Sequence, residues 1–426
     1  MRAFRIISFI FFLSDIMLFS ESFDFHVAPM VGYTDRHFRY LLRLLHPKAI
    51  LWTEMLKPRD IFDASDQKRN SLLTRGAELS IVRTIDSDSH GPRCVLQLGG
   101  DSAEDLVRAI HTAEPYDYSE INLNCGCPSI ESHAPFGAAL MRRPDHVAYL
   151  LDRMAEATRL PVSVKCRIGI HESAASVTED DYRLLYDFLS KITASKSCSN
   201  VVIHARSAIL QGLSPSANRS VPPLRYDFAV RAAGDFPEVS IAVNGGLDSV
   251  AALEQFQPTA LSGAMAGRWC ISRPLDLLLL HSPEEDCFAL ASKAIDSYCS
   301  YAGRELQVLS KDQIPHIFAP IAILLTSLFD GEDTSLEKSS HYGGAISVDQ
   351  KEELIRSLML GANAALTVSG YSHLSLSKEL ESLITSDDRD SLPKRQFRKI
   401  VTSFVGKKFI TKLRTNTITS SDCHSC

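Results

Sequence analysis

A pair of cysteines near the middle of the chain carries the clearest signal for chemistry. Cys125 and Cys127 close the stretch EINLNCGCPS, residues 120–129, in which apolar residues alternate with Asn122 and Asn124. Alternation that ends in glycine and proline predicts a short strand that delivers side chains to a loop. The thiol of Cys127 would then lie just past the strand end, exposed and able to react. A buried core cysteine, and a Cys-x-Cys pair that binds metal or forms a disulfide, are the alternatives.

Polar residues and glycines stand at the ends of eight apolar runs, this one included. They are Pro29 and Met30, Glu54, Gln97, Asn124 with Cys127, Lys165 with Arg167, His204 with Arg206, Asn244-Gly245-Gly246, and Gly267-Arg268. Each has a structural alternative, since Lys165 could be a surface lysine, His204 a core histidine and Gln97 a loop cap. Packing does not explain why all of them share one end of their strands. We therefore predict that they form one site.

The elements that must position these residues alternate between strands and helices. The apolar runs begin at Phe25, Ala49, Cys94, Glu120, Pro161, Asn200, Ser240 and Ala260. Helical patterns lie between them, for example after Ser102 and after Asp145, with apolar residues three and four apart. Eight such units predict an α/β fold closed into a (β/α)8 TIM barrel at residues 25–281. The rival is an open doubly wound sheet, which loses support because no G-x-G-x-x-G follows the first strand.

The chain changes character after the predicted barrel. Strand alternation stops at His281, and long helical patterns predict a smaller all-helical domain over residues 282–415. A stretch rich in Gly, Ser and charge at residues 330–349 is expected to be a loop-like insertion in that domain. Residues 416–426 are expected to be a tail.

The N-terminus resembles the start of a signal sequence. Arg2 and Arg5 precede an apolar run that Asp15 interrupts, so residues 1–24 are expected to be a targeting segment or an N-terminal extension. An extra hydrophobic helix and a misplaced start codon are the alternatives. The compartment therefore stays open between the cytoplasm and an organelle.

The composition is that of a globular protein, with 426 residues, 45% hydrophobic and 23% charged. Its net charge of −6 means that a nucleic-acid partner must be met by a local basic patch. The segment Ser391–Thr415 offers one, because it has no Asp or Glu and carries eight cations: Lys394, Arg395, Arg398, Lys399, Lys407, Lys408, Lys412 and Arg414. Contact with phosphate backbones is the favoured interpretation, and a solvated helix face is the alternative.

Ten cysteines are spread along the chain, several of them inside apolar runs, as Cys94 and Cys166 are. This distribution argues against a disulfide framework. Cys423 and Cys426, with His424 between them, could bind metal or do redox chemistry, but a disordered tail is the preferred interpretation. No metal site is predicted.

The last two strand ends have the composition of a phosphate site. Asn244–Gly246 and Gly267–Arg268 stand where (β/α)8 barrels bind phosphate with the backbone N–H groups after strands seven and eight. A phosphorylated flat cofactor, flavin mononucleotide (FMN), is therefore expected across the barrel mouth. Gln97 would hydrogen-bond the pyrimidine edge of the flavin, and Lys165 would stabilise the anionic reduced flavin. Phosphosugar isomerases share the phosphate site but have no use for Cys127.

Residues from Val27 to about Leu275 carry motifs that resemble those of tRNA-dihydrouridine synthases. The motifs are APMVGYTDRHFRYLLRLL, LWTEML, LQLGG, YSEINLNCGCPS, FGAALM, PVSVKCRIGI, NGG and GAMAGR. A further block, HARSAILQGLSPSANRSVPPLRYD, is similar to the DusA-like branch of that family, the tRNA-dihydrouridine(20/20a) synthases. The resemblance implies an FMN-binding (β/α)8 barrel followed by a helical tRNA-binding domain.

The resemblance also implies a reaction in the D-loop of tRNA. NADPH would reduce FMN, the flavin would give a hydride to C6 of a uracil, and Cys127 would give a proton to C5. Cys127 occupies the GCP position of its motif, whereas Cys125 stands where relatives carry other residues. Only Cys127 is therefore expected to be essential. Asn124 and Arg167 would contact the uracil edge of a base swung out of the tRNA.

The other site residues are carried over from the same motifs. The FMN contacts fall on Pro29, Met30, Gln97, Lys165, His204, Asn244, Gly245, Gly246, Gly267 and Arg268. The tRNA contacts of the LSP..NR loop fall on Ser216, Ala217 and Arg219. Two departures are visible: Ser216 and Ala217 replace longer polar or charged residues, and the segment Ile130–Pro135 is shorter than usual. No stable protein partner is implied, and a monomer is expected. A flavin oxidoreductase of free pyrimidines and a non-catalytic RNA-binding relative are the competing functions.

Overall fold

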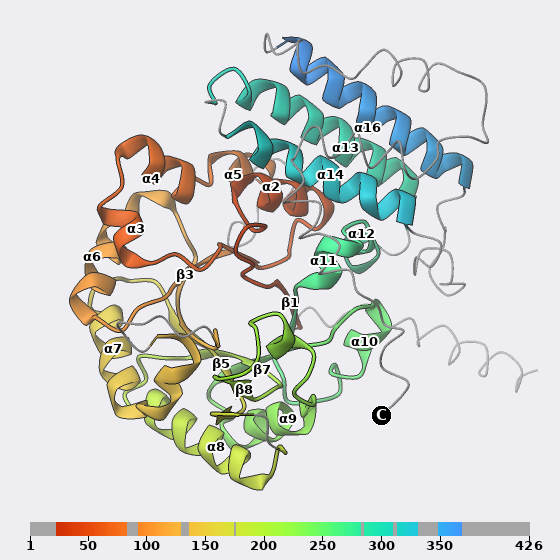
Figure 1. The fold of residues 1–426 in the computed structure, drawn as a ribbon. Coiled ribbons are helices and arrows are strands. Elements are labelled where there is room, and N and C mark those ends of the chain that lie inside the picture. The colour runs from red at the N-terminus through yellow and green to blue at the C-terminus, as the bar shows by residue number, and fades with distance from the viewer. Residues whose placement is uncertain are drawn as a thin grey trace, which may run out of the picture.

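Eight parallel strands form the central sheet of the computed structural model, which describes residues 23–82, 93–128, 136–173, 176–282, 285–309, 313–330 and 348–368 (Figure 1). Neighbouring strands follow the order β1-β10-β9-β7-β5-β4-β3-β2. The strands are β1 (Asp24–Val27), β2 (Leu51–Trp52), β3 (Cys94–Leu98), β4 (Glu120–Cys125), β5 (Val162–Arg167), β7 (Asn200–His204), β9 (Ser240–Asn244) and β10 (Gly263–Ala266). All eight overlap the predicted apolar runs, which confirms the prediction of the strands.

The sheet closes on itself between β1 and β2. The Val27 amide donates to the Ile50 carbonyl oxygen over 2.9 Å, and the Ile50 amide donates back to β1 over 2.9 Å. A parallel bridge between His26 and Ile50 lies at the same place. The chain therefore forms a (β/α)8 barrel, as predicted, and the open sheet is excluded. A short parallel pair, β6 (Ile170–His171) and β8 (Ala208–Ile209), extends β5 and β7 and was not predicted.

Helices cover the outside of the barrel and follow the strands in turn (Figure 1). They are α2 (Arg36–Leu45), α3 (Pro58–Phe62), α4 (Asp66–Leu73), α5 (Gly76–Val82), α6 (Ala103–Ala113), α7 (Pro144–Glu156), α8 (Glu179–Thr193), α9 (Tyr226–Asp235), α10 (Val250–Glu254), α11 (Arg268–Ser272) and α12 (Asp276–His281). Short 3₁₀ turns are η1 (Glu114–Tyr116), η2 (Gly137–Arg142) and η3 (Ala217–Arg219). Local signals start the helices: Asp35 caps α2 through the amides of His37 and Phe38, and Thr178 forms a capping box with Asp181 at α8. The two helical patterns singled out in the sequence are α6 and α7.

Every second residue of a strand points into the barrel. These interior residues form an apolar side and a polar side. The apolar side consists of Ala28, Ile50, Trp52, Val95, Val202, Ala242 and Met265. The polar side lies along β3, β4 and β5 and consists of the buried residues Gln97, Asn122, Asn124, Ser163 and Lys165. Residues at the intervening positions, such as Leu123, Cys125 and Cys166, belong to the outer core beneath the helices. Strand parity thus decides which side chains reach the interior.

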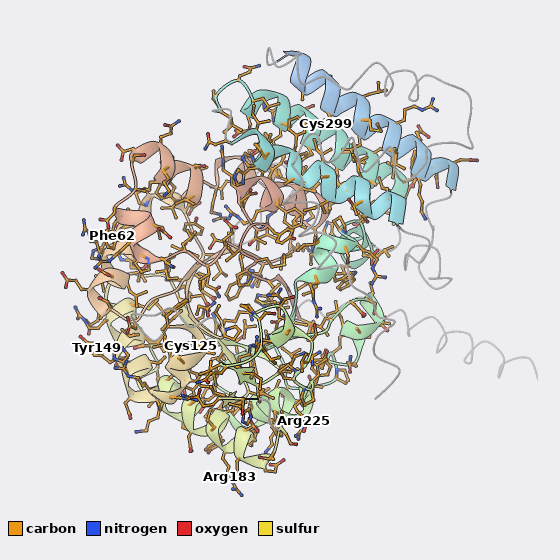
Figure 2. The ribbon with its side chains drawn as sticks, viewed as in Figure 1. Phe62, Cys125, Tyr149, Arg183, Arg225 and Cys299 are labelled. Atoms are coloured by element: carbon orange, nitrogen blue, oxygen red, sulfur yellow. The ribbon has the colours of Figure 1, made fainter. Side chains whose placement is uncertain are left out.

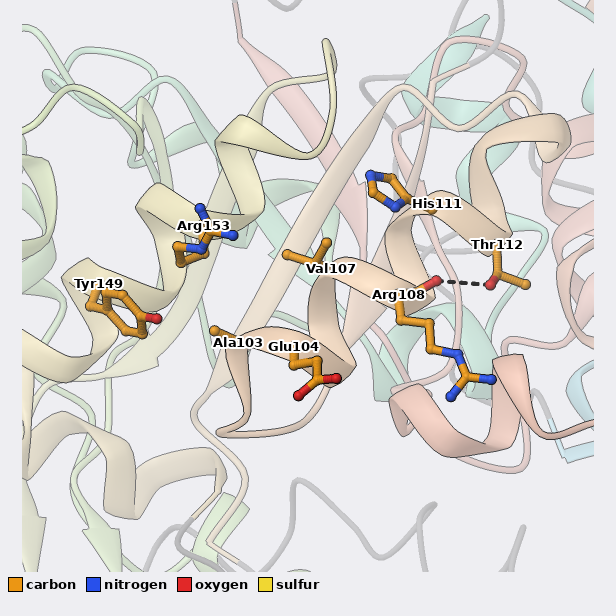
Figure 3. A pocket seen from close by; sticks show the side chains of 8 residues that line it. All are labelled: Ala103, Glu104, Val107, Arg108, His111, Thr112, Tyr149 and Arg153. Carbon is orange, nitrogen blue, oxygen red and sulfur yellow. Dashed lines mark hydrogen bonds between the residues drawn. The ribbon is translucent and has the colours of Figure 1, made fainter.

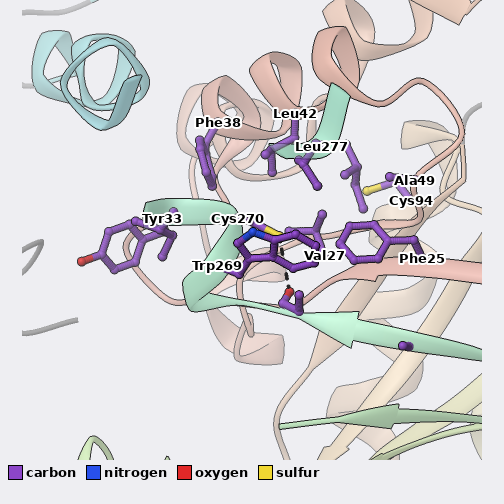
Figure 4. Close-up of a cluster of buried hydrophobic side chains, with 14 of the residues drawn as sticks. Phe25, Val27, Tyr33, Phe38, Leu42, Ala49, Cys94, Trp269, Cys270 and Leu277 are labelled. Atoms are coloured by element: carbon purple, nitrogen blue, oxygen red, sulfur yellow. Dashed lines mark hydrogen bonds between the residues drawn. The ribbon is translucent and has the colours of Figure 1, made fainter. Parts of the chain in front are cut away.

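The outer core fills the space between the strands and α2, α11 and α12 (Figure 4). The rings of Phe25 and Trp269 meet edge to face, with centroids 6.0 Å apart. The buried indole N–H of Trp269 donates to Asp276 Oδ2 over 2.7 Å, and Leu42 and Leu277 lie in the same cluster. This packing fixes α11, and with it the start of α11 at Arg268, against β1 and α12.

Three further helices form a layer that lies beside α2 (Figure 1). They are α13 (Cys287–Glu305), α14 (Ile314–Asp330) and α16 (Val348–Val368). The first two match the long helical patterns of the sequence. The third lies in the region predicted to be helical, although it was not singled out and its first two residues belong to the stretch expected to be a loop. The prediction of a smaller all-helical region after the barrel is confirmed.

Helix α2 joins this helical layer to the barrel. The Tyr301 hydroxyl lies 2.7 Å from His37 Nδ1, and the Tyr301 ring stacks on Tyr40 with centroids 4.1 Å apart. Arg36 pairs with Glu305 over 2.8 Å. One continuous apolar cluster runs from the strands through α2 into α13, α14 and α16. The two parts of the protein therefore share a core.

Several predictions concern residues outside the described ranges. They are the signal-like segment, most of the insertion at 330–349, the short Ile130–Pro135 segment, the basic segment Ser391–Thr415 and the terminal pair Cys423 and Cys426. Within the described ranges, no helix has both the length and the apolar character needed to cross a membrane.

Candidate active site

Strand register brings the predicted strand-end residues together at one mouth of the barrel. Asn124 of β4 is the register partner of Lys165 of β5, and Arg167 is the partner of His204 of β7. His204 in turn pairs with Asn244 of β9. All of them lie at or near the carboxyl ends of parallel strands, where (β/α)8 barrels carry their sites. The residues read from the sequence as one group are neighbours in the fold.

A ladder of side-chain hydrogen bonds crosses the polar side of the barrel interior. Gln97 Nε2 donates to Asn122 Oδ1 over 2.9 Å, and Asn122 Nδ2 donates to Ser163 Oγ over 2.7 Å. At the mouth, Asn124 Nδ2 donates to Gln97 Oε1 over 2.9 Å. At the other end, the Ser163 hydroxyl donates to the Glu120 carboxylate. Each member fixes the direction of the next, so the amides of the site are oriented before any ligand arrives.

Cys127 lies in the turn that follows β4. Its amide donates to Asn124 Oδ1 over 2.9 Å, and its carbonyl oxygen accepts from the Ala138 amide over 2.8 Å. Its side chain is partly exposed, whereas Cys125 is fully buried in the barrel wall (Figure 2). Burial raises the pKa of the Cys125 thiol well above its ordinary value, so this thiol is inert. Of the two cysteines, Cys127 is the one that can present a thiol at the mouth.

Lys165 is the buried cation at the centre of the site. Its Nζ donates to Asn244 Oδ1 over 2.9 Å, and Asn244 Nδ2 donates to the Met265 carbonyl oxygen over 2.8 Å. Burial, with a smaller contribution from Arg167, lowers the pKa of Lys165 to about 7. An anion beside the ammonium group would raise this pKa again and would be stabilised in return.

Lys165 belongs to a group of basic side chains around His204. Burial holds the pKa of His204 well below its ordinary value, and Arg167, Lys165, Arg206 and Arg268 lower it further. His204 is therefore neutral, and it sits among four basic side chains. A protein with a net charge of −6 concentrates positive charge at its barrel mouth, which attracts anionic ligands.

Two of these arginines hold the loops around the mouth. Arg167 Nε donates to the Gly126 carbonyl oxygen over 3.1 Å, and its Nη1 donates to the Asn218 carbonyl oxygen over 2.9 Å. Arg268 Nη2 donates to the Arg219 carbonyl oxygen over 3.3 Å. These acceptors are neutral, so the hydrogen bonds leave the positive charge of both guanidinium groups in place.

Gly245 and Gly246 form a bare strand end beside His204. Their φ angles are 120° and 67°, in the region that favours glycine. A Cβ on Gly245 would lie 2.8 Å from His204 Cδ2, and one on Gly246 would lie 2.6 Å from Leu224 Cδ1. The Tyr226 hydroxyl donates to the Gly245 carbonyl oxygen over 2.5 Å and holds this turn. A side-chain-free backbone next to a cluster of cations fits a phosphorylated ligand such as FMN.

The loop after β1 forms another part of the mouth. Pro29 and Met30 are partly exposed there, and a Cβ on Gly267 would lie 3.2 Å from the sulfur of Met30. The carboxylate of Glu54, at the end of β2, accepts a hydrogen bond from the Gly32 amide. Burial raises the pKa of Glu54. The β1 loop is thus held from both β2 and β10.

The predicted tRNA-contact residues lie farther out. Ser216 is exposed, and Ala217 and Arg219 are partly exposed in η3. Between them, Asn218 is fully buried and was missed by the sequence analysis. Its Oδ1 accepts from the Ile209 amide over 2.7 Å and its Nδ2 donates to the Ile209 carbonyl oxygen over 2.8 Å. Asn218 anchors the turn that carries Arg219, and no local sequence pattern reveals the distant partner.

A separate groove of about 540 Å³ lies on the outer wall of the barrel, between α6 and α7 (Figure 3). Its lining residues are Ala103, Glu104, Val107, Arg108, His111, Thr112, Tyr149 and Arg153. None of them is a strand-end residue. The groove is therefore separate from the site at the mouth.

Comparison with known proteins adds to this geometry. The family model described as "Dihydrouridine synthase (Dus)" matches residues 26–328. A tRNA-dihydrouridine(20/20a) synthase of Xanthomonas campestris pv. campestris is 41% identical over 252 residues, 59% of this chain and 68% of the relative. A relative of the same name from Shewanella oneidensis is 40% identical over 253 residues, 59% of this chain and 68% of the relative. Another, from Vibrio cholerae serotype O1, is 37% identical over 287 residues, 66% of this chain and 80% of the relative. The chain belongs to the dihydrouridine synthase family.

Proposed function

We propose that the protein reduces uridine to 5,6-dihydrouridine in the D-loop of tRNA, with FMN as its flavin and NADPH as the reductant. The observation that carries the proposal is the position of Cys127, in a turn that Asn124 and Arg167 hold at the mouth of a dihydrouridine synthase barrel. The similar proteins named tRNA-dihydrouridine(20/20a) synthases support tRNA as the substrate. We further propose that the protein acts as a monomer.

The residues at the mouth suit FMN. The backbone of Gly245, Gly246 and Gly267, with Arg268, would hold its phosphate. Lys165, Gln97, His204 and Asn244 would contact the ring system, and Pro29 and Met30 would contact it through their backbone. Gln97 suits a pyrimidine edge, because its oxygen and its NH₂ each keep one hydrogen-bonding position after the ladder is formed. When bound, FMN would supply the hydride.

The proton would come from the thiol of Cys127, which is the role that the family resemblance implies for it. Donation leaves a thiolate, and Lys165, Arg167 and Arg219 all lie near enough to Cys127 to interact with it electrostatically. Ser216, Ala217 and Arg219, on the outer turn, would contact the tRNA that delivers the base.

Replacement of each cysteine tests the proposal. Cys127→Ala should keep FMN but lose about 100- to 10,000-fold in the rate of dihydrouridine formation, the usual range for a positioned acid. Cys125→Ala should stay active, because Cys125 faces the outer core and not the mouth. Dihydrouridine formed in unmodified tRNA transcripts is the measurement. Turnover by Cys127→Ala at the wild-type rate would contradict the assignment.

A further inference from the structure

Asn124 is committed to the turn that carries Cys127. Its Oδ1 accepts from the Gly126 amide over 3.0 Å and from the Cys127 amide over 2.9 Å. Its Nδ2 donates to Gln97 Oε1 over 2.9 Å. A carbonyl oxygen has two lone pairs and an amide nitrogen two N–H groups, so the oxygen is fully used and one N–H remains.

The orientation of this amide is fixed. A flipped Asn124 would point its N–H groups at two backbone N–H groups and its oxygen at Gln97 Oε1. Gln97 cannot turn to compensate, because its own Nε2 donates to Asn122 Oδ1 over 2.9 Å. The ladder of the barrel interior therefore dictates that oxygen faces the cysteine turn.

The other polar groups of the turn are held as well. Arg167 Nε donates to the Gly126 carbonyl oxygen over 3.1 Å, and the Ala138 amide donates to the Cys127 carbonyl oxygen over 2.8 Å. The contact with η2 is close, since a Cβ on Gly137 would lie 2.4 Å from that same carbonyl oxygen. The backbone N–H and C=O groups of both Gly126 and Cys127 are thus hydrogen-bonded. Their partners come from β4, β5 and η2.

We propose that Asn124 is a positioning residue, which holds the thiol of Cys127 at the barrel mouth, and that its contact with the uracil is at most one N–H. Arg167 assists by holding the Gly126 carbonyl oxygen. The inference rests on the proposed function for the role of the thiol, and it revises the expectation that both residues serve the uracil edge. A loop that carries an acid must keep it within a narrow range of positions, because a misplacement of about 1 Å can cost about 100-fold in rate.

Two substitutions separate positioning from substrate contact. Asn124→Ala removes every hydrogen bond of the amide. Asn124→Ser has no amide for the uracil, but a hydroxyl can still accept from backbone N–H groups two or three residues on, though more weakly. Positioning predicts that kcat falls about 10- to 100-fold in Asn124→Ala and recovers in part in Asn124→Ser, with KM for tRNA within about twofold of wild type. Asn200→Ala is the matched control, because Asn200 donates to Glu120 at the far end of the ladder.

A second measurement needs no tRNA. The other cysteines of the described ranges are buried, whereas Cys127 is partly exposed. In a protein with Cys423→Ser and Cys426→Ser, iodoacetamide should therefore alkylate mainly Cys127. Release of the turn in Asn124→Ala should raise the alkylation rate at least about threefold, whereas Asn200→Ala should leave it unchanged. A Cys127→Ala variant of the same protein verifies which thiol is labelled.

The two measurements distinguish a failure of this inference from a failure of the proposed function. A raised KM with unchanged alkylation, and a serine variant as poor as the alanine variant, would overturn the inference and make Asn124 a substrate contact. Changed alkylation together with full turnover by Cys127→Ala would leave Asn124 as the residue that positions this turn and would refute the proposed proton donor instead.

Discussion

Lys165 should make the proposed binding of FMN depend on pH in a defined direction. Its pKa is lowered to about 7 in the protein without ligand, so the ammonium form falls from about one half of the molecules at pH 7 to about one tenth at pH 8. The flavin ring would place hydrogen-bond acceptors beside Nζ, and these stabilise the ammonium form and raise the pKa again. Binding above pH 7 must therefore take up a proton, and affinity must fall as the pH rises.

The size of the effect follows from the two fractions. If FMN binds the ammonium form, the dissociation constant at pH 8 should be about fivefold larger than at pH 7, which corresponds to about 1 kcal/mol. The useful window is pH 7 to 8. Below it the flavin phosphate itself titrates, and above it Arg167 begins to lose its proton, since burial lowers the pKa of Arg167 to about 9.

Quenching of flavin fluorescence measures the dissociation constant at each pH, and calorimetry in two buffers of different ionisation enthalpy measures the proton uptake. Lys165→Met is the matched control, because it keeps a long unbranched side chain but cannot be charged. This variant should bind FMN weakly and with no change between pH 7 and 8. A wild-type dissociation constant that is the same at both pH values, with no proton uptake, would refute the reasoning.

Three other predictions address the phosphate site, the basic segment and the core. Gly245→Ala should lower FMN occupancy in the purified protein, because the new Cβ would meet His204. Gly212→Ala is the control and should leave occupancy unchanged, because Gly212 also has a positive φ but has open space around it. Reversal of the charges of Lys394, Arg395, Arg398 and Lys399 should weaken tRNA binding and flatten its salt dependence by up to about 0.9 per phosphate contact in a log–log plot, and equal affinity across a salt titration would exclude the segment from the tRNA site. Burial lowers the pKa of His37 and of His46 to about 3. The stability that these neutral histidines contribute is present above the unfolded-state pKa of about 6.5 and is lost as the pH falls toward 3. By pH 5 the free energy of unfolding should have fallen by about 2 kcal/mol for each histidine. Thermal midpoints at pH 7 and 5 check this, and a His46→Gln protein with an undiminished pH dependence would count against it.

The sequence predicts the barrel well because strand signals are local. Alternation and flanking turn residues mark each strand from β1 to β10, and the shared carboxyl ends follow from parallel pairing. Local pattern also distinguishes Cys125 from Cys127, since the first lies inside the strand and the second lies beyond it. The two-residue strands β6 and β8 are too short to leave a periodic signal.

The hydrogen bonds of the site could not be predicted in the same way. Gln97 and Asn124 are 27 positions apart and Asn218 meets Arg167 across 51, and nothing in either local sequence names the partner. The sequence therefore indicates which amides lie at the mouth but not which of their atoms are already engaged. That difference is what turns Asn124 from an expected uracil ligand into a proposed support for Cys127.

The core shared through α2 has a consequence for domain exchange between relatives. A barrel cut off after His281 would leave Tyr40 and His37 facing water in place of Tyr301, together with the apolar groups beneath α13 and α14. An exposed patch of that kind favours aggregation. A chimera that swaps the helical layer to alter tRNA choice should therefore carry the matching face of α2 with it, so that the unit of exchange begins in the first barrel helix and not at the domain boundary.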